Sequence, residues 1–120
     1  MHKNFELSSL LTFFENDQMA VHDYLVVVID DWKVLMEELK TAVSNQNFQD
    51  YRSVIHRMLT PMRLLKMAEM QNILNNGNFR IELSSEPENQ IYFEALFAKI
   101  EEFLQELKDI LPTLENNPNG

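Results

Sequence analysis

His56 is the residue of this sequence whose type and neighbours suit it to act as a nucleophile. It lies in the stretch DYRSVIHRMLTPMRLLK, residues 50–66, of a chain with net charge −9. Four of the chain's ten basic residues, here named the cationic cluster, fall in this stretch: Arg52, Arg57, Arg63 and Lys66. A neutral imidazole offers a nitrogen lone pair, and nearby cations can hold anionic oxygens, which are the two requirements of phosphoryl transfer to a side chain. We therefore take His56 as the candidate nucleophile.

One apolar stripe predicts the helix that carries His56. The stripe has spacings of three and four residues and consists of Phe48, Tyr51, Ile55, Met58, Met62 and Leu65. At roughly 100° per residue, His56 lies about 130° from the middle of this stripe, so its ring is predicted to point to solvent. Arg52, Thr60 and Arg63 lie four or seven residues from His56 and share its face.

Similar stripes predict the remaining elements and an all-α fold. We expect helices over about 18–44, 48–64 and 67–74, and a last helix that begins near Pro87 and ends at Pro112. Gly77 is expected to end the third of these in a left-handed conformation. The short connections predict an antiparallel four-helix bundle with residues 5–14 as a lid helix. The chain is expected to be one domain over 1–120, with frayed tails at 1–4 and 113–120.

Composition excludes several classes of function. The chain has no cysteine, so disulfides, zinc-thiolate sites and thiol catalysis are excluded. The acidic balance argues against nucleic acid as a partner. The longest apolar run, Tyr24 to Ile29, is too short to span a membrane, and we expect a cytoplasmic protein without membrane contact. No Glu-x-x-His pair, HExxH, glycine-rich phosphate loop or Gly-x-Ser-x-Gly occurs, so no metal or hydrolase site is predicted.

Less specific interpretations apply to several residues. His2 and His22 are expected to be incidental, and the cationic cluster could be only a solvated helix face. Trp32 lies on an apolar stripe and is expected to be core. The methionines of residues 58–70 are likewise expected to fill the core.

The order of these elements resembles the histidine-containing phosphotransfer (HPt) domain of two-component phosphorelays. The resemblance covers nearly the whole chain: a short first helix, then DQMAVHDYL…LMEELKTAV, then NFQDYRSVIHRML, then the helix from Met67 to Leu74. It implies that His56 is the phosphoaccepting histidine. The family motif His-x-Leu-Lys-Gly reads His-Arg-Met-Leu-Thr here, with Leu59 in place of the lysine and Thr60 in place of the glycine. We predict that Arg52 or Arg63 supplies the charge of the missing lysine.

The resemblance also implies the partner. A receiver domain, free or within a hybrid sensor kinase, would exchange the phosphoryl group with His56 and would bring its own aspartate and Mg²⁺. This chain would then be a monomeric phosphocarrier without a cofactor, not an enzyme, and could be the C-terminal domain of a hybrid kinase. Arg57 and Lys66 would help to steer the receiver, and an exposed Leu59 would supply an apolar docking contact. The alternative is a degenerate HPt-like helical adaptor that binds a receiver or kinase without being phosphorylated.

Overall fold

The computed structural model describes residues 4–115, and this part of the chain is helical and contains no β-strand. All-α, the predicted class, is therefore confirmed. The elements in chain order are α1 (Leu7–Phe13), α2 (Gln18–Ser44), α3 (Phe48–Leu64), α4 (Ala68–Asn76), the short 3₁₀ helices η1 (Gly77–Phe79) and η2 (Ile81–Leu83), and α5 (Pro87–Glu115). No helix within residues 4–115 is long and apolar enough to cross a membrane.

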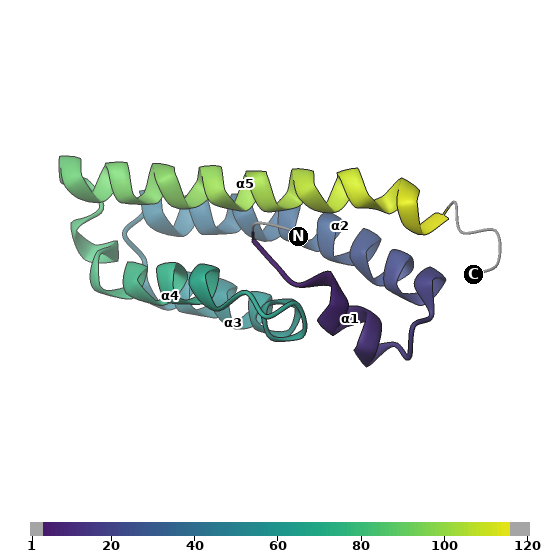
Figure 1. The fold of residues 1–120 in the computed structure, drawn as a ribbon. Helices are drawn as coiled ribbons and strands as arrows, with labels where there is room; N and C mark the ends of the chain where they lie inside the picture. Colours follow the sequence, from purple (N-terminus) through teal and green to yellow (C-terminus); the bar gives the residue numbers. More distant parts are fainter. Residues whose placement is uncertain (1–3, 116–120) are drawn as a thin grey trace.

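The two longest helices, α2 and α5, lie side by side along an elongated molecule (Figure 1). α3 packs against α2, and α4 packs against α3, so that these two helices occupy the lower part of the view in Figure 1. α1 contacts both α2 and α3. The core is continuous through all five helices and is formed mainly by Leu, Ile, Met and aromatic side chains.

α2 has the bounds that its stripe predicts. Its first turn is capped by Asp17, whose side chain accepts a hydrogen bond from the backbone amide of Ala20 at 3.0 Å. The β-branched run of residues 25–29 stays helical because its inward positions, Leu25, Val28 and Ile29, are buried. Trp32 is 1% exposed and belongs to the core, as predicted.

Three residues connect α2 to α3 and reverse the direction of the chain. Gln46 adopts a left-handed conformation with φ 52°, and the side chain of Asn47 caps α3 by accepting from the amide of Asp50 at 3.0 Å. α3 contains Pro61 and ends at Leu64, which is the predicted end of this helix. Lys66, also left-handed with φ 52°, then turns the chain into α4.

Gly77 corrects one prediction. Its φ is −61°, so it does not form the expected left-handed stop but continues from α4 into η1. A glycine is nevertheless required there, because an added Cβ would lie 2.0 Å from the Tyr51 hydroxyl oxygen and 3.2 Å from a ring carbon of Phe93. The residue serves close packing instead of a special backbone conformation.

The predicted ends of the chain also need correction. α5 does not stop at Pro112 but continues to Glu115, because Leu114 in the last turn is buried against the core. Asn4 is buried as well, and its side-chain amide donates a hydrogen bond to the Glu106 carboxylate. Asn4 and residues 113–115 are thus part of the fold, whereas the rest of the predicted tails, 1–3 and 116–120, lies outside the described residues.

Tyr51 ties α3 to α4. Its side chain is fully buried, and its hydroxyl donates a hydrogen bond to the backbone carbonyl of Leu74 at 2.7 Å. Burial raises the pKa of the Tyr51 phenol well above its ordinary value, and the nearby Tyr92 raises it further. Because the folded state holds this proton more tightly than the unfolded state, the stabilisation is complete below about pH 10 and is lost as the pH rises further.

Tyr51→Phe is therefore expected to lower the free energy of unfolding by about 1 kcal/mol at neutral pH, since one buried hydrogen bond is lost. The fall in stability above about pH 10 should become shallower at the same time. Urea unfolding followed by circular dichroism at several pH values measures both effects. Tyr24→Phe is the control, because Tyr24 is only half-buried. An unchanged alkaline profile in Tyr51→Phe would contradict this role.

Candidate functional site

His56 lies on the outward face of α3 and is exposed, as its phase in the apolar stripe predicts. The opposite face buries Ile55, Met58 and Met62 against the rest of the molecule. Because these contacts fix the rotation of α3, the imidazole is presented to solvent on a rigid helix.

A depression of about 240 Å³ surrounds the imidazole, and we name it the His56 groove. Residues of α3, α4 and η1 line it. The lining residues from α3 are Arg52, Ile55, His56, Leu59 and Arg63, and those from α4 and η1 are Gln71, Asn75 and Asn78. The histidine thus stands in a shallow polar recess and not on a flat surface.

Only two members of the cationic cluster line this groove. They are Arg52 and Arg63, and no carboxylate of residues 4–115 forms an ion pair with either of them. The Arg52 guanidinium lies over the ring of Phe48 at 5.7 Å from its centroid, which orients the side chain without neutralising its charge. Both positive charges therefore remain available to an anion bound at His56.

The other two cations are directed elsewhere. Arg57 forms an ion pair with Glu38 of α2, with 2.7 Å between its Nη2 atom and the carboxylate, and this hydrogen bond raises the pKa of Arg57. Lys66 is exposed beyond the end of α3 and lines a different cavity. Four cations were expected around His56, but only Arg52 and Arg63 line its groove. Arg57 pairs with Glu38 of α2, and Lys66 lies in the turn between α3 and α4.

The two residues that replace the lysine and glycine of the family motif are placed differently. Leu59, which the docking hypothesis takes as exposed, instead follows the alternative interpretation of a residue at the edge of the core: it is half-buried and forms part of the groove wall. Thr60 is exposed but does not line the groove.

Three carboxamides in the His56 groove were not predicted from the sequence: Gln71, Asn75 and Asn78. Met70 and Leu74 bury one face of α4, which leaves Gln71 and Asn75, four residues apart, together on the face beside α3. That spacing was the available signal. The Asn78 side-chain oxygen is buried and has no hydrogen-bond partner in the described part of the chain.

Together these groups suit the binding of a compact anion on a nucleophile. A nitrogen nucleophile stands at the groove, two guanidinium groups supply paired donors for anionic oxygens, and the carboxamides add neutral donors. Among residues 4–115, no group of three His, Asp or Glu side chains is arranged to hold a metal ion. The residues that line the groove can supply charge stabilisation and positioning.

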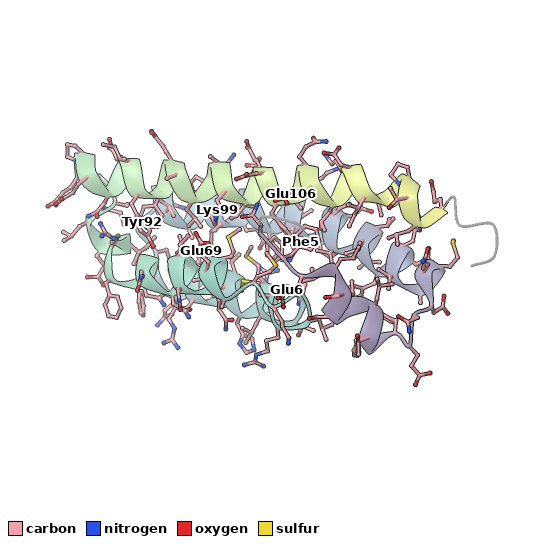
Figure 2. All side chains as sticks on the ribbon, in the orientation of Figure 1. Phe5, Glu6, Glu69, Tyr92, Lys99 and Glu106 are labelled. Atoms are coloured by element: carbon pink, nitrogen blue, oxygen red, sulfur yellow. The ribbon has the colours of Figure 1, made fainter. Side chains whose placement is uncertain are left out.

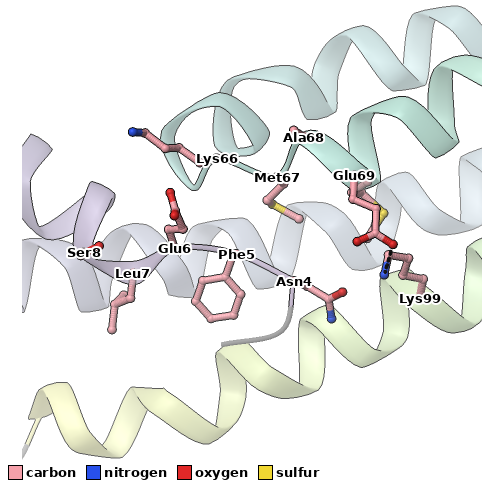
Figure 3. Close-up of a pocket in the computed structure, with 11 residues that line it drawn as sticks. Asn4, Phe5, Glu6, Leu7, Ser8, Lys66, Met67, Ala68, Glu69 and Lys99 are labelled. Carbon is pink, nitrogen blue, oxygen red and sulfur yellow. Dashed lines mark ion pairs between the residues drawn. The ribbon is translucent and has the colours of Figure 1, made fainter. Parts of the chain in front are cut away.

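A second cavity of different character lies beyond the C-terminal end of α3 (Figure 3). It measures about 590 Å³ and lies between residues 4–8, the turn at 66–70 and Lys99 of α5. Figure 2 shows that Glu69 and Lys99 face one another between α4 and α5, and they form an ion pair at 3.3 Å. Glu69 pairs with Lys99 here, and Glu6 adds a second carboxylate, so this cavity contains acidic groups whereas the lining of the His56 groove contains none.

His22 is not a second candidate nucleophile. Its ring nitrogens lie 3.0 Å from Asp23 and 3.1 Å from Glu115, and its side chain is only 13% exposed. It joins the first turns of α2 to the last turn of α5. The sequence interpretation of His22 as incidental missed this structural contact.

The chain was compared with models of protein families, with curated proteins and with solved structures, and none of them matches it.

Proposed function

We propose that the protein is a histidine phosphotransfer carrier in a two-component phosphorelay. One observation carries the proposal: an exposed imidazole on a rigid helix, in a recess lined by two guanidinium groups without carboxylate partners. An HPt-like architecture belongs to the proposal, with α2, α3, α4 and α5 as an antiparallel four-helix bundle and α1 as its lid. A cytoplasmic location, where receiver domains work, also belongs to it.

The chemistry is an exchange between two acceptors. A nitrogen of the His56 imidazole attacks the phosphorus of an aspartyl phosphate on a receiver domain, so that a P–N bond forms and the P–O bond to the aspartate breaks. The aspartate leaves as a free carboxylate, and the reverse reaction passes the phosphoryl group to a second receiver. The receiver, free or within a hybrid sensor kinase, supplies Mg²⁺. This chain supplies the nitrogen and the charges that hold the phosphoryl oxygens.

The test is whether the protein accepts label from a receiver domain phosphorylated with acetyl phosphate and Mg²⁺. A phosphocarrier gains label that is lost in acid and retained in alkali, which is the stability pattern of phosphohistidine. Binding of the receiver without transfer of label would overturn the proposal. That result would favour the alternative of a non-phosphorylated adaptor, which the replacements at Leu59 and Thr60 keep open.

The two groove arginines are expected to carry the charge stabilisation. Arg52→Gln and Arg63→Gln should each slow transfer from the receiver about tenfold, because each removes a charge-assisted contact worth ~1.4 kcal/mol in the transition state. Labelling reactions with a fixed concentration of phosphorylated receiver, quenched at successive times, measure the transfer rates.

Arg57→Gln is the matched control for these variants. It removes an equal charge from the same helix, but its guanidinium is held by Glu38 and does not line the groove. Its rate should stay within about twofold of wild type, since exposed ion pairs contribute little. Equal rates in Arg52→Gln, Arg63→Gln and wild type would show that neither guanidinium stabilises the phosphoryl group.

A further inference from the structure

Two large apolar side chains are exposed next to the His56 groove. Phe79, at the end of η1, is 86% exposed, and Leu83, at the end of η2, is 52% exposed. Together with the half-buried Phe48 they line a hollow of about 250 Å³, whose other lining residues are Asn78 and Glu82. We name it the Phe79 hollow. Exposed apolar residues are ordinarily scattered singly, so two that gather at one hollow beside a half-buried phenylalanine indicate an interaction surface.

This hollow adjoins the His56 groove. Asn78 lines both of them. Arg52 lines the groove, and its guanidinium lies over the ring of Phe48, which lines the hollow. A partner that reaches the imidazole along this side therefore meets Phe79 and Leu83 at the same time.

Hydrogen bonds hold the apolar surface in place. The Asn89 side chain donates to the carbonyl of Leu83 at 2.9 Å and accepts from Arg80 at 2.8 Å. The Ser84 hydroxyl donates to the carbonyl of Val43 at 2.8 Å. Because the segment is already ordered by its neighbours, little conformational freedom is lost when a partner binds it.

Charge identifies the kind of partner. The chain as a whole repels an acidic protein, since its net charge is −9. The groove is the exception, because its lining contains Arg52 and Arg63 and no acidic residue. Glu82 is the single carboxylate that lines the hollow, and it does not line the groove. The combined surface complements a protein that presents an acidic pocket with an apolar residue beside it.

We propose that the Phe79 hollow is the docking surface for the receiver domain, whose acidic phosphorylation pocket faces Arg52 and Arg63 while an adjacent apolar side chain contacts Phe79 and Leu83. This inference rests on the proposed function and adds the place where the partner binds. The apolar contact sets affinity, and the arginines set orientation.

The experiment compares two phosphoryl donors on Phe79→Ala/Leu83→Ala. One donor is a receiver domain phosphorylated with acetyl phosphate and Mg²⁺, and the other is phosphoramidate, which needs no docking surface. The double variant should require at least about tenfold more receiver for half-maximal transfer, while its labelling by phosphoramidate stays at the wild-type rate. Ile91→Ala, a control that shortens a 67% exposed side chain on α5, should behave as wild type with both donors.

Each other outcome has a definite meaning. Wild-type half-saturation in the double variant would overturn the docking surface and leave the phosphocarrier function intact. Labelling of wild type by phosphoramidate but by no receiver would keep His56 as an acceptor and overturn the receiver as its partner. Absence of label from both donors would overturn the proposed function itself.

Discussion

Replacing His56 with glutamine is expected to reduce transfer of label from a phosphorylated receiver to background. Glutamine keeps a polar side chain of moderate size, but its amide nitrogen has no lone pair available for attack on phosphorus. The loss should be at least about 10³-fold, because no other group in the groove is a nucleophile of comparable strength. Labelling followed by acid and alkali treatment measures the result.

Folding should not obscure this experiment. The His56 side chain is exposed, so its replacement removes no core contact and the unfolding midpoint should stay unchanged. His22→Gln is the matched control, since His22 lies between Asp23 and Glu115 with a mostly buried side chain. It should retain full labelling. Label that persists in His56→Gln would place the phosphoryl group on another residue.

Gly77→Ala is expected to have the largest effect on stability. The new methyl group would lie 2.0 Å from the hydroxyl oxygen of Tyr51 and 2.8 Å from its Cζ atom. Tyr51 is fully buried and hydrogen-bonded to Leu74, so it cannot move aside without losing that bond. Overpacking and the lost hydrogen bond together should lower the free energy of unfolding by about 3 kcal/mol or more, measured by urea unfolding.

A double-mutant cycle tests the cause of this effect. In a Tyr51→Phe background the closest atom is gone, so Gly77→Ala should cost less than in wild type by about 1 kcal/mol. Part of the cost should remain, because the ring carbon of residue 51 and the Phe93 ring still lie near the added methyl. Equal costs in the two backgrounds would show that the effect arises from the backbone and not from this contact.

Local signals in the sequence account for the helices that were predicted well. The apolar stripes of α2 and α3 define which residues face inward, and the side chains of Asp17 and Asn47 mark the starts of these helices. The outward phase of His56 follows from the same stripe. These features depend on residues within a few turns of one another, which is the range over which a sequence pattern is informative.

The features that were missed depend on contacts between distant segments. Gly77 is required by Tyr51 of another helix, and α5 continues past Pro112 because Leu114 reaches the core. In the site, Arg57 forms an ion pair with Glu38 of α2, a residue 19 positions earlier in the chain. The carboxamides Gln71 and Asn75 join the groove only through the packing of α4 against α3. None of these partners can be identified from periodicity alone.

The ion pair between Arg57 and Glu38 has a thermodynamic consequence under the proposed function. A phosphoryl group adds close to two negative charges to His56, and each cation in reach lowers the free energy of that state. With Arg57 engaged by α2, two guanidinium groups balance the added charge instead of three. If His56 is phosphorylated as proposed, the modified protein would therefore have a higher group-transfer potential, which would favour prompt delivery to the next acceptor over long storage.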